Sequence, residues 1–428
     1  MEINARRNYH RLPMHRPDLV QTLTEAHADH LRDESRRIGR AEVIARPRSE
    51  AEVIAVLREM AAKKVAVTVQ GARTGITAGA VPDGGLVLTL QGMNAVENLR
   101  RSPDGAWHIT VQPGMLLADL RAALRHSAIP GSVTWDIEQQ AILAAFRAAG
   151  PFAWPPDPTE TSASIGGMVA CNASGACSFR YGPTRNHVTA MRVVMADGDV
   201  IELRRGEHRA AGRQFSLHTA AGRKLSGALP SYVLPAVKNA AGYHAAGDMD
   251  LLDLFIGAEG TLGVVTRAEL RLSPAPPVIW GVTAFLPTMT DALRFVRAAR
   301  GEHLAGVPPV AERPAAIELF DRRALDLLRR QKNERPSFAW LPAIPGAGNT
   351  AIYVEYHCAD EDAAGKAVES LAATLTACGG AEGNTWIATS AHEVELAGRF
   401  RHAVPESVNL LIDERRRNVP GLTKLGTD

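Results

Sequence analysis

Hydrophobic positions in the first part of the chain alternate between the spacing of helices and that of buried strands. Apolar residues recur every three or four positions among charges over 18–38, which predicts an amphipathic lead-in helix. Ser49, followed three positions later by Glu52, has the pattern of a capping box and predicts a helix over 51–63. The elements expected after it are strands at 65–69, 86–90 and 107–111 and helices at 117–126 and 137–149.

The pattern changes in the middle of the chain. The segment 131–152 mixes a predicted helix with Trp- and Pro-rich flanks and indicates an insertion to which we assign no function. Asp197-Gly198, between two apolar runs, predicts a β-hairpin, and the polar stretch 204–231 predicts an exposed loop. Prolines crowd 274–277 and mark a domain boundary. The elements expected beyond it are strands at 279–285 and 351–356 and helices at 291–300, 324–330 and 363–377.

Composition favours a two-domain protein that acts on a small molecule. The chain has 428 residues, which is longer than one ordinary domain, and its composition of 46% apolar and 22% charged residues can bury a large core. Lys and Arg total 48 against 46 Asp and Glu, without a long run of one sign, so no nucleic-acid partner is expected. We find no apolar run of about 18 residues, no signal-peptide core and no CxxC spacing among the four cysteines. These features predict a cytoplasmic protein with reduced thiols and no transmembrane segment.

Three stretches of small residues, 70–79, 157–175 and 257–263, interrupt the predicted elements. The first, QGARTGITAG, can offer successive backbone N–H groups to a diphosphate, with Arg73 adding charge. It is neither a GxGxxG fingerprint nor a Walker loop. A tight structural turn explains the first stretch about as well, and it explains the third stretch better when that stretch is taken alone. Three such stretches in one chain, however, favour a long, flat ligand that spans them.

Motifs in and around these stretches stand in a distinctive order. They read VQGARTGITAGAVP at 69–82, SIGGMVACNASG at 164–175, RYGPTR at 180–185 and EGTLGVVT at 259–266. With them, residues 46–274 resemble the FAD-binding domain of the vanillyl-alcohol oxidase and para-cresol methylhydroxylase (PCMH) type. The resemblance is nearest to the D-lactate dehydrogenase and glycolate oxidase branch. That family reads PRGGGTGLTGGAVP in the first motif, and this chain departs from it at Gln70, Ala72, Arg73 and Ala78, and from the second motif at Met168.

The resemblance implies FAD as the cofactor. Some relatives attach the flavin covalently through histidine, but no histidine lies between Gln70 and Pro82, so we expect non-covalent FAD. The residues that the resemblance assigns to the cofactor are Gly71, Ala72, Arg73, Thr74, Gly75, Gly79, Pro113, Gly114, Asp157, Ser162, Ser164, Gly166, Gly167, Asn172, Gly175, Glu259, Gly260, Gly263 and Val264.

The resemblance also implies an α+β fold in three parts. We expect a helical lead-in over 1–40, a two-subdomain PCMH-type FAD-binding domain over 41–276, and an incomplete antiparallel-sheet α+β substrate domain over 277–428. The last part is expected to be truncated, because the family continues to an HxGDGNxH-like segment whose histidines bind a divalent metal. No pair of histidines here has that spacing, so no metal ligand is assigned. His357, His392 and His402 are scattered through this part, and we interpret them as surface or core residues.

A 2-hydroxy acid carries a carboxylate, for which a guanidinium fork is the natural receptor. The segment RFRHAVPE at 399–406 resembles the family's LREGIPEA, whose arginine contacts the substrate carboxylate, and this implies Arg401. Lys424 resembles a lysine that follows in the family and is expected to assist. Without the resemblance, Arg401 would be interpreted as a solvated or salt-bridged residue on a helix. No residue is assigned as the catalytic base.

The resemblance implies oxidation of a D-2-hydroxy acid such as D-lactate to the 2-oxo acid, by hydride transfer to the flavin. The electron acceptor would be a cytochrome, a quinone or an electron-transfer flavoprotein. Two alternatives stay open: an FAD-binding fragment or subunit without full catalytic activity, and a flavoenzyme like alkylglycerone-phosphate synthase, for which the sequence has no positive signature. His27 and His30 are interpreted as surface residues, because no carboxylate or thiol accompanies them.

Overall fold

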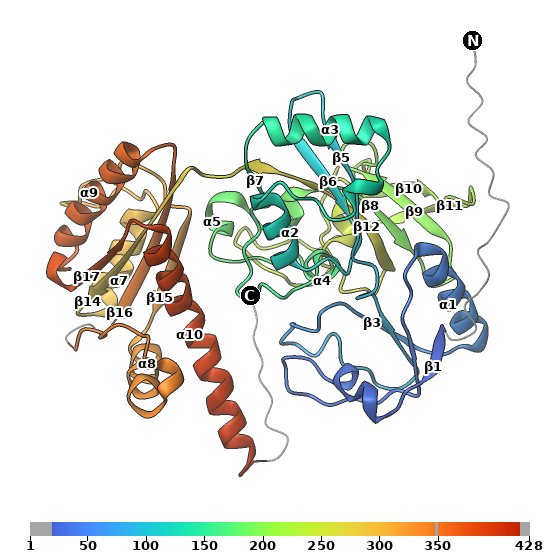
Figure 1. Ribbon diagram of the computed structural model, residues 1–428, viewed down its shortest axis with the longest axis horizontal. Helices are drawn as coiled ribbons and strands as arrows, with labels where there is room; N and C mark the ends of the chain where they lie inside the picture. The colour runs from blue at the N-terminus through green and yellow to red at the C-terminus, as the bar shows by residue number, and fades with distance from the viewer. Residues whose placement is uncertain (1–18, 347–349, 420–428) are drawn as a thin grey trace.

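The computed structural model describes residues 19–346 and 350–419, which form three larger sheets flanked by helices (Figure 1). The first sheet pairs β1 antiparallel with β2, while β2, β4 and β3 run parallel. Its strands are β1 (Val20–Thr22), β2 (Val43–Ala45), β4 (Leu86–Thr89) and β3 (Val67–Gln70). The helix α1 (Glu50–Lys63) buries an apolar face that includes Val53 and Leu57. The side chain of Ser49 accepts a hydrogen bond from the Glu52 amide, which confirms the predicted start of this helix.

The second sheet is antiparallel throughout and forms the centre of the molecule. Its strands, in spatial order, are β5 (Val96–Arg101), β6 (Trp107–Val111), β12 (Val264–Arg271), β8 (Val188–Val194) and β9 (Val200–Arg204). The helices around its core are α2 (Leu117–Arg125), α3 (Ile137–Ala148), α4 (Ile165–Ala170) and α6 (Leu252–Phe255). Phe146 of α3 stacks on Phe152, 4.9 Å between centroids, and meets the edge of Trp107 at 5.2 Å. The segment interpreted as an insertion is therefore built into the main hydrophobic core.

The third sheet has helices on both faces. Its strands, in spatial order, are β15 (Ala316–Phe320), β16 (Thr350–Cys358), β14 (Val278–Leu286) and β17 (Thr385–Ala388), all antiparallel. On one face α7 (Met289–Ala299) and α9 (Glu361–Ala377) pack on alternate residues such as Val354. On the other, α8 (Arg322–Glu334) and α10 (Ala391–Arg416) pack on the intervening ones such as Tyr353. The period of two along each strand separates these two cores.

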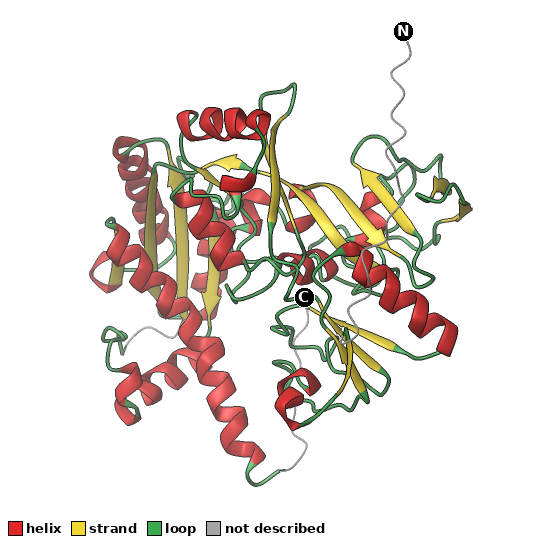
Figure 2. Ribbon diagram, turned by 45° about the vertical axis from the view of Figure 1, so that its right-hand side comes forward, coloured by secondary structure: helices red, strands yellow, loops and turns green. Residues whose placement is uncertain are grey.

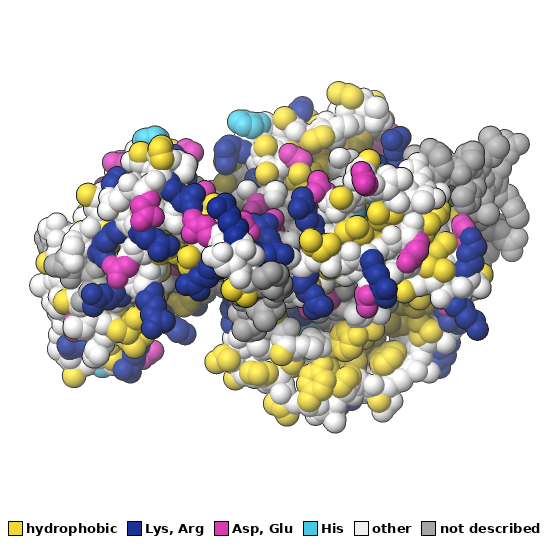
Figure 3. All heavy atoms as spheres, turned by 90° about the horizontal axis from the view of Figure 1, so that it is seen from below, with side chains coloured by type: hydrophobic (Ala, Val, Ile, Leu, Met, Phe, Trp, Pro, Cys, Tyr) yellow, Lys and Arg dark blue, Asp and Glu magenta, His cyan; other side chains and the backbone are white. Residues whose placement is uncertain are grey.

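The short pair of β7 (Phe152–Ala153) with β13 (Ser273–Pro274) lies where the chain leaves the second sheet for the third. Figures 1 and 2 both show α10 running from the third sheet back toward the first. There Arg36 forms an ion pair with Asp413 at 3.4 Å. On the face shown in Figure 3, basic and acidic side chains are interspersed. Among the residues described, we find no helix with the length and apolarity needed to cross a bilayer.

The structure confirms the predicted α+β class but corrects two predictions. The helix expected over 18–38 is wrong: β1 and a 3-10 helix, Glu25–Leu31, occupy this segment. Val20–Thr22 pairs with β2 instead, because helix stability in proteins comes mainly from tertiary packing and not from local spacing alone. The exposed loop expected over 204–231 contains a hairpin of β10 (Gln214–His218) and β11 (Lys224–Ala228). In the third sheet and its helices, β15, β17 and α10 were not predicted.

Candidate functional site

The three glycine-containing stretches predicted to bind a flavin lie next to one another. We call them the first loop (70–79), the second loop (157–175) and the third loop (257–263). The backbone nitrogen of Ala72 lies 3.3 Å from Oγ of Ser164, which joins the first loop to the second. The amide of Gly257 donates to the carbonyl of Val169 at 3.0 Å, which joins the second loop to the third. Residues distant in the chain thus form one continuous surface.

Several glycines of these loops are explained by loop packing. A Cβ on Gly71 would lie 2.1 Å from Oγ of Ser164, and a Cβ on Gly175 would lie 1.3 Å from the carbonyl oxygen of Asp157. Neither position tolerates a side chain, whether or not a ligand is bound. Gly75 differs, because a Cβ there would meet nothing within 4 Å. The first loop is therefore open at Gly75, which suits the close approach of a ligand.

Two departures from the glycine-rich pattern carry backbone strain. Arg73 has φ of 62° and Ala78 has φ of 65°, in the left-handed region where glycine is favoured. For an L-residue with a side chain, this conformation costs about 1–2 kcal/mol. The family that this loop resembles has glycine at both positions. The loop thus keeps the backbone shape of the glycine-rich sequence without its glycines.

The N-terminal segment holds the first loop in place through a buried histidine. Nδ1 of His30 lies 2.9 Å from Oε1 of Gln70, and Nε2 of Gln70 donates to the carbonyls of His30 and Ala80. Arg73 Nη1 lies 3.2 Å from the same Nδ1. Burial lowers the pKa of His30 although the bond with Gln70 opposes this. Our interpretation of His30 as a surface residue is therefore wrong: only 7% of it is exposed.

The remaining residues assigned to the cofactor lie on or beside these loops. Gly114 follows Pro113, whose Cβ would lie 2.5 Å from a Cβ on Gly166. Ser162 is exposed and bonds to Glu160 instead, with Oγ and Oε1 2.8 Å apart. The others are Thr74 and Gly79 on the first loop, Gly167 and Asn172 on the second, Glu259, Gly260 and Gly263 on the third, and Val264 at the start of β12. The second substrate residue, Lys424, lies outside the described residues.

Arg401, the predicted carboxylate anchor, lies on α10 and faces the second loop. Its guanidinium forms ion pairs with Glu318 at 2.5 Å, Asp157 at 3.7 Å and Glu355 at 3.8 Å, and only 10% of its side chain is exposed. It also lies over the ring of Tyr353, 5.1 Å from the centroid. Burial lowers the pKa of Arg401, but the charge and hydrogen bond of Glu318 outweigh this and raise it. One permanent cation therefore joins the second loop to the third sheet.

A cavity of about 500 Å³ opens beside this cation. Arg401, His402 and Glu318 line it from the third sheet and its helices, and Thr159 lines it from the second loop. Ligand cavities commonly have volumes of about 300–1,000 Å³. The cavity can hold a small acid, and a guanidinium at its wall can bind the carboxylate of that acid.

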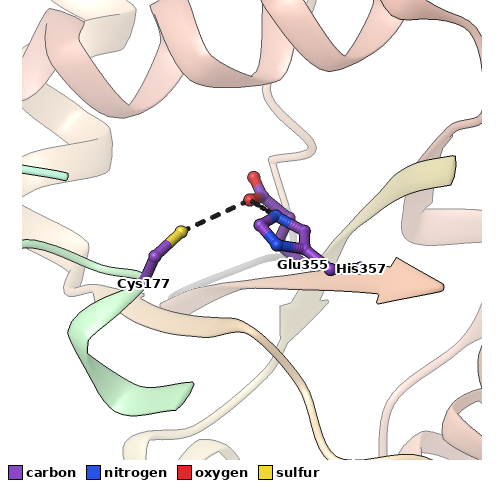
Figure 4. A group of neighbouring side chains, drawn as sticks. All are labelled: Cys177, Glu355 and His357. Atoms are coloured by element: carbon purple, nitrogen blue, oxygen red, sulfur yellow. Dashed lines mark hydrogen bonds and ion pairs between the residues drawn. The ribbon is translucent and has the colours of Figure 1, made fainter. Parts of the chain in front are cut away.

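A buried polar network continues from Arg401 along β16. Tyr353 donates to Oε2 of Glu355 at 2.5 Å, and Oε1 of Glu355 lies 2.8 Å from Nε2 of His357. Nδ1 of His357 lies 2.8 Å from the hydroxyl of Tyr181, on the short helix α5 (Ser178–Tyr181). The thiol of Cys177 donates to Glu355, with sulfur and oxygen 3.6 Å apart (Figure 4). The network links both halves of the chain.

Burial and hydrogen bonding act in opposite directions on the acid at its centre. Burial raises the pKa of Glu355, but hydrogen bonds from His357 and Tyr353 and the charges of His357 and Arg401 outweigh it, so the pKa falls. Burial and the Glu355 charge both raise the pKa of the Cys177 thiol. Glu355 is thus a carboxylate and Cys177 a neutral thiol in this environment.

Sequence reasoning missed Cys177, Glu318 and Glu355. A signal for Glu355 exists: Tyr353, Glu355 and His357 alternate within a strand whose remaining positions are largely apolar, so their side chains share one face. A glutamate and a histidine on the same face of a buried strand need polar partners. The alternation within this strand therefore predicts a buried polar site.

Both halves of the chain match models of known protein families. A model of the "FAD binding domain" matches residues 41–146 and 137–204, and a model of the "FAD linked oxidases, C-terminal domain" matches residues 276–417. The D-lactate dehydrogenase of Anaerostipes hadrus is 30% identical over 72% of this chain and 51% of that protein. The D-2-hydroxyglutarate dehydrogenase of Xanthomonas citri pv. viticola is 34% identical over 66% and 46%. The chain spans about half the length of the curated relatives it matches.

A solved structure of alkyldihydroxyacetonephosphate synthase has the same fold, with a TM-score of 0.55 and 16% sequence identity. The match covers 85% of this chain and 59% of that protein. At this identity the likeness concerns the fold alone.

Proposed function

The chain belongs to the FAD-linked oxidases with a PCMH-type FAD-binding domain, and from this premise we propose that it oxidises a D-2-hydroxy acid to the 2-oxo acid. FAD is its cofactor. The observation that carries the proposal is Arg401, a buried cation on the wall of a cavity that the second loop and the third sheet share. Bound FAD supplies a two-electron acceptor for the hydride that leaves the substrate carbon.

The three loops fit an extended dinucleotide. They form one continuous surface through Ser164 and Val169, and the first loop is open at Gly75. Backbone N–H groups of such a loop are suitable donors to a diphosphate. We propose that the FAD is bound non-covalently, since no histidine lies on the first loop. We also propose 41–276 as the FAD-binding domain and 277–428 as the substrate domain, with 1–40 as a lead-in. Matches to family models over 41–204 and 276–417 support this division.

Arg401 orients the acid by binding its carboxylate. Three carboxylates surround this guanidinium in the structure, so an incoming acid has to replace one of them. Glu318 is the best candidate, because its side chain is 31% exposed against 24% for Asp157 and 10% for Glu355. A bidentate bond of Arg401 to the substrate then holds the hydroxyl-bearing carbon at a fixed distance from the second loop. We propose Lys424 as a second carboxylate contact.

We propose a D-lactate-like acid as the substrate. The electron acceptor would be a cytochrome, a quinone or an electron-transfer flavoprotein. Curated relatives named D-lactate dehydrogenase and D-2-hydroxyglutarate dehydrogenase support this class of acid. Selectivity within the class depends on the groups that line the cavity beyond Arg401, such as Thr159 and His402.

The visible spectrum of the FAD-loaded protein tests the proposal. Under anaerobic conditions D-lactate, D-2-hydroxyglutarate and glycolate are added separately, with L-lactate as the stereochemical control. We expect one of the D-acids to bleach the oxidised flavin band and L-lactate to leave it unchanged. A flavin that stays oxidised with all the acids would contradict the proposed oxidation and favour an FAD-binding subunit without turnover. Failure to bind FAD would overturn the cofactor as well.

A further inference from the structure

Three side chains of different chemistry converge in the network beside Arg401. Sγ of Cys177, a carboxylate oxygen of Glu355 and a ring nitrogen of His357 all lie within 4.8 Å of one another. Oε1 of Glu355 lies 3.6 Å from Sγ of Cys177 and 2.8 Å from Nε2 of His357. Figure 4 shows Cys177, just before α5, reaching toward the two residues of β16. This geometry gathers a thiol, a carboxylate and an imidazole around one point.

We propose that Cys177, Glu355 and His357 form a binding site for a divalent ion of the Zn²⁺ type. These three groups are the usual zinc ligands, at about 2.3 Å for sulfur and about 2.0–2.2 Å for nitrogen and oxygen. Two ligands at such distances in a tetrahedron are separated by about 3.3–3.7 Å. The sulfur and oxygen already have this separation, and the nitrogen and oxygen need to part by about half an ångström. Three protein ligands leave the fourth position to water.

The outer partners of the ligands match those of a metal site. A ligating histidine is usually oriented by a bond from its other nitrogen, and a ligating carboxylate by a bond to its other oxygen. Tyr181 bonds to Nδ1 of His357 at 2.8 Å, and Tyr353 donates to Oε2 of Glu355 at 2.5 Å. With the outer atoms held in this way, Nε2 of His357 and Oε1 of Glu355 lie side by side, and the thiol of Cys177 is close to both. Each ligand of β16 is thus held by a tyrosine that is not itself a ligand.

Charge balance also permits the ion. A thiolate and a carboxylate neutralise its two positive charges. Arg401 lies 3.8 Å from Glu355, but its own charge is matched by Glu318 and Asp157. The thiol of Cys177 loses its proton when the metal–sulfur bond forms, so binding of each ion releases about one proton to the solvent. The ion would join α5 to β16 and fix the third sheet against the FAD-binding half of the chain.

Zinc binding to the FAD-loaded protein tests the site directly. The protein is treated with a chelator, loaded with Zn²⁺ and freed of excess metal, and the zinc content is then measured. X-ray absorption at the zinc edge identifies the ligands, because sulfur and the lighter atoms differ in scattering and distance and the flavin does not contribute. We expect one zinc per chain with one sulfur at about 2.3 Å and two or three nitrogen or oxygen ligands.

Variants separate this site from other zinc-binding positions. Cys177→Ser should remove the sulfur signal and weaken zinc binding at least ~10-fold. Cys358→Ser is the matched control, because Cys358 is a buried thiol next to His357 that does not belong to the group. Tyr181→Phe should weaken zinc binding by ~10-fold or more while the sulfur signal stays, since it removes only the bond that orients His357. Retention of FAD checks that each variant is folded.

The site would be disproved if wild-type protein binds no zinc, or binds it without a sulfur ligand. A Cys177→Ser variant that binds zinc as tightly as wild type would also overturn it, and the three residues would then form a hydrogen-bonded network only. None of these measurements uses a hydroxy acid. Failure of the proposed oxidation would therefore leave the zinc site standing, and the reverse also holds.

Discussion

Replacing Glu318 by glutamine should tighten the binding of a carboxylate at Arg401. Oε2 of Glu318 lies 2.5 Å from Nε of Arg401 and occupies the edge of the guanidinium that an incoming carboxylate needs. Glutamine keeps the size and the carbonyl oxygen of the side chain but removes the negative charge. The carboxylate of the substrate then competes with a neutral amide instead of with another carboxylate.

The expected change in the binding free energy of the carboxylate depends on how far solvent screens the pair of Glu318 and Arg401. A hydrogen bond to a charged group contributes about 1.5–3 kcal/mol. The side chain of Glu318 is 31% exposed, and solvent screening reduces the difference between carboxylate and amide, so we expect about 1–2 kcal/mol. This corresponds to a dissociation constant lower by ~5- to ~30-fold. Asp157 and Glu355, at 3.7 and 3.8 Å from the guanidinium, are unchanged by the substitution.

Pyruvate, the product expected from D-lactate, is a suitable probe because it binds without being oxidised. It is titrated into the oxidised FAD-loaded protein while the flavin spectrum is followed. Glu312→Gln is the matched control, because Glu312 pairs with Arg180 at 3.8 Å and its side chain is 45% exposed. Arg401→Lys in the same titration should weaken binding ~10-fold or more, because lysine lacks the planar fork. Unchanged or weaker pyruvate binding in Glu318→Gln, with FAD retained, would refute the displacement of Glu318, and unchanged binding in Arg401→Lys would refute the role of Arg401.

Three further predictions concern stability. Ala78→Gly should raise the free energy of unfolding by about 1 kcal/mol, because glycine relieves the strain of a φ of 65°. Ala72→Gly is the control and should not raise it, because Ala72 has no positive φ. Denaturant unfolding measures both variants, and equal effects would argue against strain at Ala78. His30 has a lowered pKa, so the stability it confers is present above its ordinary value of 6.5 and is lost as the pH falls below it. In His30→Gln, the decrease in Tm between about pH 7 and about pH 5 should be smaller than in wild type, and an equal decrease would assign it to other groups. Phe146→Ala should cost about 3–5 kcal/mol, because Phe146 is fully buried against Phe152, and a loss below about 1 kcal/mol would mean that α3 is dispensable.

Local signals explain the parts of the fold that could be predicted. Ser49 caps α1 as expected, β6 spans the predicted 107–111, and Asp197-Gly198 turns β8 into β9. In each case the residues that decide the structure lie within a few positions of one another. The hairpin of β10 and β11 escaped prediction because its alternation rests on few apolar side chains, of which Leu217 is buried.

The glycine-rich motifs predict one cofactor site from the sequence, and the contacts between the loops refine that prediction. Gly71 and Gly175 are required by neighbouring backbone and side chains, whereas Gly75 is open to a ligand. A glycine in a sequence does not distinguish these cases, because both require the absence of a Cβ. Only the position of the neighbouring loop separates them.

By itself the sequence predicted the α+β class, the order of the loops, the family and Arg401 as the candidate carboxylate anchor, because these depend on local periodicity and on motifs of adjacent residues. The tertiary structure decided what surrounds Arg401. Glu318 and Glu355 come to Arg401 from two different strands, and Cys177 meets His357 from 180 positions away in the chain. No local pattern encodes such pairs, since they meet only when the third sheet packs against the second loop and buries their charges together.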